Sequence, residues 1–230
     1  PGVKLLATSW VQFATGYRMD LARIGAACRE RGIFFVVDAI QGLGALTLDL
    51  SRVPVDILAC GAQKWLLSPW GSGFVYVREA LARALEPPLV SWMAPKGTDD
   101  FRRLRDYDMT WRDDARRFEF ITLPFQDFAG MNASLDLFFE VGLETVYERV
   151  ETLASDLIAG ARAAGVAVVT PVEPQRRGGV VCLKPKDAER VSARMKERGI
   201  VHSYREGAIR LSPHFYNTSD DVQAALALLS

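Results

Sequence analysis

Ile33-Phe34-Phe35-Val36-Val37-Asp38 is the stretch that decides the fold, because five apolar residues in a row end at an acid. A short, continuous apolar run predicts a strand that is covered on both faces, as in a parallel sheet. An acid directly after such a strand lies at the strand's carboxyl end, where open α/β sheets bind their ligands. Asp38 is therefore the first candidate site residue.

Short apolar runs alternate with a helical pattern on either side of this strand. We expect strands at residues 3–8, 56–60 and 73–77, and an amphipathic helix at residues 21–31 that Gly32 ends. Such alternation predicts an α/β fold with a mostly parallel sheet.

The second half of the chain predicts a linking helical segment and a small carboxyl-terminal α+β domain. Helical periodicity runs over residues 125–164 with an interruption at Gly142. We expect strands at 166–170, 179–183 and 209–212, and helices at 187–198 and 219–229. The predicted division is 1–125 for a part of a large domain, 126–164 for the linking segment and 165–230 for the small domain.

Residues 86–117 differ from their surroundings. They are rich in Pro, Arg and Asp, which predicts surface loops with a short strand or two. The mixture of Arg and Asp is interpreted as a solvated face.

Composition excludes several classes of protein. The net charge is zero, so we expect no nucleic-acid partner, and no apolar run is long enough to cross a bilayer. Three scattered cysteines, Cys28, Cys60 and Cys182, argue against a disulfide framework and predict a cytoplasmic location. His202 and His214 lack the spacing of a metal pair, so no metal site is expected.

A lysine follows the next predicted strand of the same sheet, in Gly61-Ala62-Gln63-Lys64-Trp65. The side chains of Lys64 and Asp38 could therefore reach one crevice. A lysine amine condenses with an aldehyde cofactor to form a Schiff base. A carboxylate that faces a pyridine nitrogen keeps that nitrogen protonated, so the ring can accept electrons. A surface lysine beside a capping aspartate is the alternative interpretation.

A longer stretch of sequence around these two residues resembles the class V aminotransferase family of type I fold pyridoxal-phosphate enzymes. The resemblance is carried by Val37-Asp38-Ala39-Ile40-Gln41-Gly42-Leu43-Gly44, Gln63-Lys64-Trp65-Leu66-Leu67 and Gly71-Ser72-Gly73-Phe74-Val75-Tyr76-Val77. That family includes cysteine desulfurases, kynureninases, aminotransferases and isopenicillin N epimerase-like members. The resemblance covers nearly the whole chain, but family chains are longer at the amino end, so we expect an amino-terminally truncated sequence.

The resemblance implies a role for each matching position. Lys64 is implied as the catalytic Schiff-base lysine for pyridoxal 5'-phosphate, and Asp38 as the partner of its ring nitrogen. Gln41 would bind the ring hydroxyl, and Thr122 would bind the phosphate of a neighbouring subunit's cofactor, which implies a homodimer. Arg210 would pair with the substrate carboxylate, a task that suits a guanidinium.

The chain departs from the family pattern in several places. Family members commonly have Ser-Gly-His-Lys where this chain has Gly61-Ala62-Gln63-Lys64, so Gln63 is the remaining cofactor-binding candidate. The amino-terminal phosphate-binding loop and ring-stacking residue of the family are missing, and the fragment alone is expected to be inactive. The region 202–207 lacks the cysteine of desulfurases.

The resemblance therefore predicts a pyridoxal-phosphate enzyme that acts on an amino acid or amine, with aminotransferase or epimerase-like chemistry. A pyridoxal-phosphate lyase of the desulfurase or kynureninase kind is one alternative. A non-catalytic, dimer-forming fragment and an unrelated nucleotide-binding fold are the others.

Overall fold

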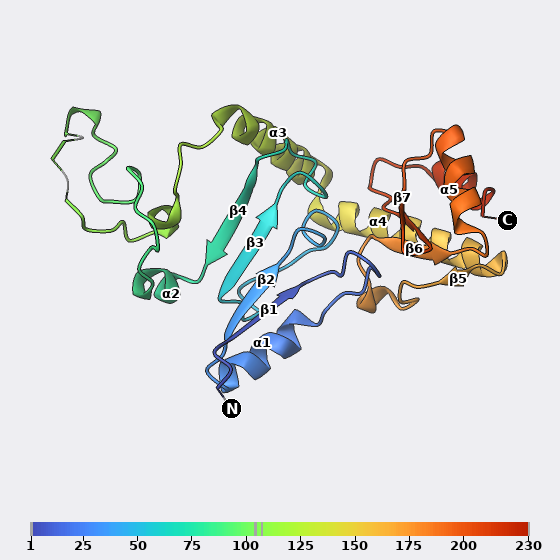
Figure 1. The fold of residues 1–230 in the computed structure, drawn as a ribbon, viewed down its shortest axis with the longest axis horizontal. Coiled ribbons are helices and arrows are strands. Elements are labelled where there is room, and N and C mark those ends of the chain that lie inside the picture. The colour runs from blue at the N-terminus through green and yellow to red at the C-terminus, as the bar shows by residue number, and fades with distance from the viewer. Residues whose placement is uncertain (1, 104, 107, 230) are drawn as a thin grey trace.

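The computed structural model describes residues 2–103, 105–106 and 108–229 of the chain. Figure 1 shows two sheets at opposite ends of a pair of helices, and a lobe that projects from the far side of the first sheet. Each sheet has its own apolar core.

The first sheet is mixed but mostly parallel, as predicted. Its strands are β1 (Leu5–Ser9), β2 (Phe34–Asp38), β3 (Ile57–Gly61) and β4 (Gly73–Val77), in the spatial order β1-β2-β3-β4. The β1–β2 and β2–β3 pairings are parallel, whereas β4 runs antiparallel to β3. Parallel neighbours bring the carboxyl ends of β2 and β3 to one edge of the sheet, where the candidate lysine and aspartate follow.

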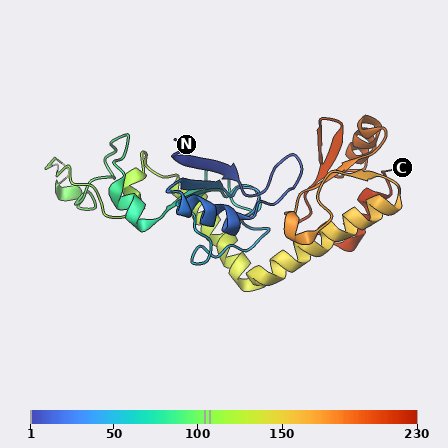
Figure 2. The ribbon, with the colours of Figure 1, turned by 90° about the horizontal axis from the view of Figure 1, so that it is seen from below.

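Helices cover one face of this sheet (Figure 2). Helix α1 (Leu21–Glu30) begins at Asp20, whose carboxylate accepts a hydrogen bond from the backbone of Arg23. Side chains of α1 and α3 (Phe125–Val141) pack on Phe35 and Val37, which are fully buried. The other face is more open, and the side chain of Phe34 is 43% exposed. The expectation that β2 is covered on both faces was therefore wrong for the described residues.

Two consecutive helices connect the sheets, as the periodicity predicted. Helix α3 ends at Gly142, which has a φ of 91°, and α4 (Leu143–Ala163) follows at once. A residue with a side chain would be strained at that φ, so glycine permits the change of direction. The short helix α2 (Glu79–Ala84) was not expected.

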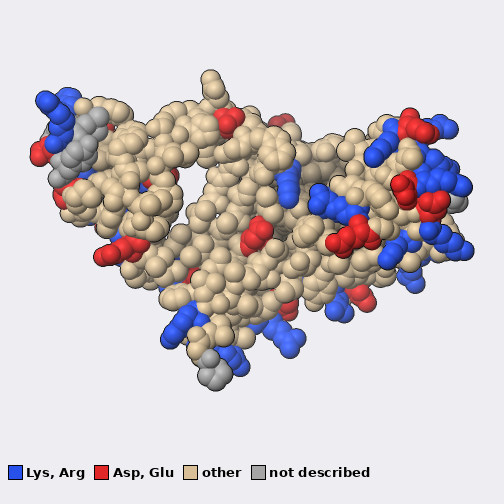
Figure 3. All heavy atoms as spheres, in the orientation of Figure 1, with Lys and Arg blue, Asp and Glu red and all other residues tan. Residues whose placement is uncertain are grey.

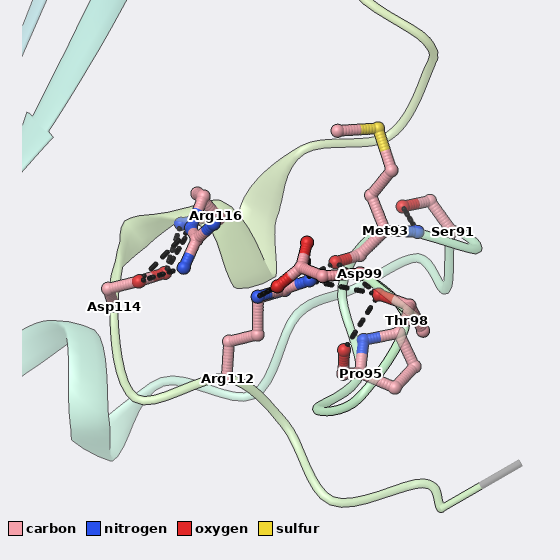
Figure 4. A network of polar contacts seen from close by, with 8 residues as sticks. All are labelled: Ser91, Met93, Pro95, Thr98, Asp99, Arg112, Asp114 and Arg116. Atoms are coloured by element: carbon pink, nitrogen blue, oxygen red, sulfur yellow. Dashed lines mark hydrogen bonds and ion pairs between the residues drawn. The ribbon is translucent and has the colours of Figure 1, made fainter. Parts of the chain in front are cut away.

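The lobe is formed by residues 86–121 and contains two 3-10 helices, η1 (Phe101–Arg103) and η2 (Ala115–Phe118). Pro95 and Trp111 form an isolated bridge, but no strand of the kind predicted is found in the described part of the lobe. Arg112 is buried and binds both carboxylate oxygens of Asp99, at 2.8 and 2.9 Å (Figure 4). The Arg and Asp residues are therefore not simply a solvated face, because part of the charge holds the lobe's own loops together.

The second sheet is antiparallel, in the order β5-β6-β8-β7. Its strands are β5 (Ala167–Val168), β6 (Val181–Lys184), β7 (Ser203–Arg205) and β8 (Ala208–Leu211), with the 3-10 helix η3 (Pro174–Arg176) before β6. Helices α5 (Ala188–Glu197) and α6 (Ser219–Leu226) pack with α4 around its core. The α+β character was predicted, but the edge strand β7 was missed. The exact domain bounds 1–125, 126–164 and 165–230 stay a prediction.

Charged side chains gather over the second sheet and the tip of the lobe, while the middle of the face in Figure 3 is largely uncharged. Among the described residues, no helix is both long and apolar enough to span a membrane. The same residues contain no cluster of three or more His, Cys, Asp or Glu side chains suited to a metal ion.

Candidate functional site

Asp38 is the last residue of β2, and its side chain is fixed at the edge of the sheet. The backbone N–H of Ile40 donates to Oδ1 at 3.0 Å, and the hydroxyl of Ser9 lies 3.5 Å from Oδ2. The Asp38 carbonyl accepts from the backbone of Trp10 at 2.8 Å. These contacts hold the carboxylate but leave it exposed, so it can bind a further cation.

Lys64 lies in a tight turn after β3, which we call the lysine turn and define as residues 62–68. Ser68 N–H donates to the Ala62 carbonyl at 3.1 Å, and Leu67 N–H donates to the Lys64 carbonyl at 3.0 Å. Leu67 has a φ of 54°, which is strained for a residue with a side chain, and Ser134 of α3 donates to its carbonyl at 2.9 Å. Strain of this kind persists only where neighbours enforce it, so the position of Lys64 is tightly specified.

The charge of Lys64 depends on three surrounding residues. Partial burial and the positive charge of Arg210 lower the pKa of the Lys64 amine, and Arg205 adds to that effect. The negative charge of Asp38 acts in the opposite direction. Lys64, Asp38 and Arg210 therefore share one electrostatic neighbourhood, which brings together three residues that lie far apart in the sequence. A lowered pKa is a common property of lysines that act as nucleophiles or bases.

Arg210 extends from β8 to the loop that follows β1. Its Nη1 donates to the Phe13 carbonyl at 3.0 Å, and its Nη2 lies 3.4 Å from the hydroxyl of Ser203. Its Nε is buried without a hydrogen-bond partner. A guanidinium held only by neutral groups retains the capacity to bind an anion.

Gln41 is buried next to the lysine turn. Its Oε1 accepts a hydrogen bond from the indole N–H of Trp65 at 3.1 Å. The two amide protons remain as donors, and a donor is what a ring oxygen would require. The contact with Trp65 also fixes the amide beside Lys64.

Gln63 occupies the space that a side chain at residue 61 would take. A Cβ atom placed on Gly61 would lie 2.5 Å from the Gln63 Oε1 atom. Gly61 therefore makes room for the Gln63 amide, so the two departures from the family pattern are linked.

Thr122 lies in the extended segment between η2 and α3, and its side chain is exposed. No hydrogen bond joins it to Lys64, Asp38 or Arg210 in the described structure. The role in a neighbouring subunit's site, which the resemblance implies, stays a prediction.

The cysteines are poor nucleophiles in this arrangement. Burial and the charge of Asp38 raise the pKa of the Cys60 thiol to about 12. Burial also raises the pKa of Cys182, whose thiol donates to the Ala14 carbonyl at 3.1 Å. Cys28 is buried in the core of the first sheet. A thiolate is the reactive form of cysteine, and the surroundings of Cys60 and Cys182 disfavour it.

Sequence analysis missed two residues that belong to this neighbourhood. Arg205 acts electrostatically on both Lys64 and Arg210. His214 was considered as a possible metal ligand, but its Nε2 donates to the Trp65 carbonyl at 2.9 Å. Arg205 could have been found from its place five residues before Arg210 in a hairpin. The His214 contact is made to a backbone atom and leaves no signal in the sequence.

Comparison with curated proteins gives relatives of several activities. The chain is 30% identical over 219 residues to the "Uncharacterized aminotransferase YcbU" of Bacillus subtilis, with 94% of this chain and 56% of that protein covered. It is also 30% identical over 239 residues to isopenicillin N epimerase of Amycolatopsis lactamdurans, with 97% and 58% covered. The chain thus spans just over half the length of these relatives.

Solved structures agree with this result. The cystine C-S lyase C-DES, in complex with cysteine persulfide, superimposes with a TM-score of 0.87 at 26% identity and covers 98% of this chain and 60% of that one. A mutant of C-DES, described with glycine covalently linked to the PLP cofactor, gives the same TM-score at 25% identity. The apo cysteine desulfurase of Thermococcus onnurineus gives 0.81 at 25% identity, with 99% and 59% covered.

These matches explain why a mostly parallel sheet, a linking pair of helices and a small antiparallel sheet occur together, since the structural relatives are pyridoxal-phosphate enzymes of the type I fold. The family model for aminotransferase class V matches residues 1–225. This chain therefore belongs to the aminotransferase class V family.

Proposed function

We propose that this chain forms much of the active site of a pyridoxal-phosphate enzyme that acts on an amino acid or amine, by aminotransferase or epimerase-like chemistry. The observation that carries the proposal is the neighbourhood of Lys64, Asp38 and Arg210. It combines an amine of lowered pKa, a fixed carboxylate and a guanidinium without an acidic partner.

The chemistry of this donor set fits the cofactor. The Lys64 amine would bind the cofactor covalently, and the Asp38 carboxylate would hold the proton on the pyridine nitrogen. The buried amide of Gln41 has free donors for the ring oxygen, and Gln63 would contribute a further hydrogen bond. Pyridoxal phosphate, when bound, supplies a ring that accepts electron density from the substrate's α-carbon.

The protein residues would then bind the substrate and move a proton. Arg210 would hold the substrate carboxylate in a bidentate arrangement, which fixes the orientation of the α-carbon. Lys64, as a free amine, would take the proton from that carbon as general base. The nearby charges of Arg210 and Arg205 favour the neutral amine that this step needs.

An absorbance spectrum of the full-length protein with pyridoxal phosphate tests the proposal. We expect a band at about 420 nm that is lost in Lys64→Ala and kept in Lys186→Ala, which changes an exposed lysine of the small domain. Borohydride reduction followed by peptide mapping should place the cofactor on Lys64. A wild-type protein without the band at saturating cofactor, or a label on another lysine, would sink the proposal.

A lyase mechanism is the second candidate, because curated kynureninases and cysteine desulfurases are among the relatives. The buried Cys60 and Cys182 thiols speak against a cysteine-persulfide route within the described residues. A non-catalytic, dimer-forming fragment is the third candidate, and the spectrum separates it from the other two.

We propose in addition that the protein is a cytoplasmic homodimer. The support for a dimer is a set of exposed apolar side chains in and beside the projecting lobe of Figure 1: Trp92, Phe101, Phe120, Ile121 and Phe125. Large apolar patches of this kind mark interaction surfaces. Sedimentation of the full-length protein, with and without Ile121→Glu, would test the dimer.

A further inference from the structure

The hairpin of β7 and β8 places two arginines on one face of the second sheet. Glu206 and Gly207 form its two-residue turn, with φ values of 49° and 74°. Positive φ at both central residues is typical of the tight turn that fixes the register of a hairpin. Arg205 is therefore paired with Ala208, and Ser203 with Arg210.

Directly paired residues of an antiparallel hairpin point to the same face, and so do residues two apart on one strand. Arg205 is thus the diagonal neighbour of Arg210 on the face that Arg210 uses to reach Phe13. Diagonal neighbours of this kind lie about 7–8 Å apart at their Cα atoms, within reach of long side chains.

In the part of the chain that the structure describes, no acidic side chain neutralises this pair. Among the described residues, neither Arg205 nor Arg210 forms an ion pair. Burial lowers the pKa of Arg210, and the positive charge of Arg205 adds to this effect. Like charges placed side by side destabilise a sheet, so an anion bound by both arginines would offset their repulsion.

The proposed function gives Arg205 an effect on Lys64 but no anion to bind. Asp38 would serve the ring nitrogen and Arg210 the α-carboxylate, which leaves Arg205 with no anion. We infer that Arg205 binds a second anionic group of the substrate, so that the enzyme acts on amino acids with an acidic side chain. This inference rests on the proposed function for the assignment of Arg210.

Calorimetry of the full-length protein with two probes tests the inference: glutarate, which has two carboxylates, and butyrate, which has one. We expect glutarate to bind at least about tenfold more tightly than butyrate, the effect of one charge-assisted contact. Arg205→Gln should remove this difference by weakening glutarate alone. Arg190→Gln, which changes an exposed arginine on α5, should leave both affinities unchanged.

Equal affinity of the wild type for both probes, absence of binding, or an equal loss of both in Arg205→Gln would overturn the inference. The absorbance of the lysine-bound cofactor is an independent readout. A normal band without discrimination between the probes would refute only the second anion site. Discrimination without the band would refute only the pyridoxal-phosphate assignment.

Discussion

The imidazole Nε2 of His214 donates a hydrogen bond to the backbone carbonyl of Trp65, at 2.9 Å. This bond joins the segment that follows β8 to the lysine turn. Its Nδ1 accepts from the N–H of Phe215 at 2.8 Å. A carbonyl can only accept and an amide N–H can only donate, so a single neutral tautomer satisfies both contacts. His214 is 3% exposed and stacks on Tyr216.

Replacement of His214 should separate its packing from its hydrogen bond. His214→Phe keeps a ring but leaves a buried carbonyl without a donor, which should lower the free energy of unfolding by about 1–3 kcal/mol. His214→Gln retains a donor and should lose less. Urea unfolding of the full-length variants measures both, and equal stability of the wild type and His214→Phe would contradict the role of the hydrogen bond.

Stability should depend on pH through the same residue. Burial lowers the pKa of His214 below the ordinary value of 6.5, and the bond to Trp65 only partly opposes this. Protonation is then easier in the unfolded chain, so the stability contributed by neutral His214 is present above about pH 6.5 and is lost as the pH falls toward the folded pKa. The unfolding free energy of His214→Phe should fall less over this window, and parallel curves for the two proteins would show that His214 is not the cause.

Gly44 should not tolerate a side chain. It has a φ of 96°, and a Cβ there would lie 2.2 Å from the Trp65 carbonyl oxygen, the atom that His214 binds. We expect Gly44→Ala to cost about 2–4 kcal/mol by thermal or urea unfolding, since the backbone next to Lys64 must move. Gly32→Ala is the matched control, because Gly32 also has a positive φ but nothing near the added atom. Its cost should be only about 1–2 kcal/mol, and similar losses in both variants would remove the clash from the explanation.

The reactivity of Lys64 should respond in opposite directions to its two charged neighbours. Arg210→Met removes a charge that lowers the pKa of Lys64, so acylation of the amine at pH 8 should slow. Asp38→Asn removes a charge that raises it, so acylation should speed up. Mass spectrometry of the cofactor-free, full-length protein gives both rates, with Lys186 as the internal reference. A change of the same sign in both variants would contradict the shared neighbourhood.

Elements whose conformation depends mainly on their own residues could be predicted from the sequence. The apolar run before Asp38 forms a strand because its residues favour one, and the interruption at Gly142 follows from the conformational freedom of glycine. The place of Lys64 after a predicted strand pointed to that lysine, whereas only the resemblance singled out Arg210. In the structure the two residues share one electrostatic neighbourhood.

What escaped prediction depends on tertiary contacts. The three residues of β7 are too few and too polar to be identified as a strand, so Arg205 was not placed beside Arg210. Arginine side chains are usually exposed, so the burial of Arg112 was not expected. Its bidentate contact with Asp99 explains that burial. The pairing of Arg112 with Asp99 could not be predicted, because Arg and Asp are both abundant in this segment.

The contacts that complete the site also fix the order in which it can be made. The His214–Trp65 bond spans 149 residues, and the bond from Arg210 to the Phe13 carbonyl spans 197. At synthesis rates of about 5–20 residues per second, the lysine turn leaves the ribosome about 7–30 s before His214 does. During that interval Lys64 lies on a turn that lacks its hydrogen bond to His214. A nascent chain arrested before residue 200 would therefore present the lysine without the arginines that lower its pKa.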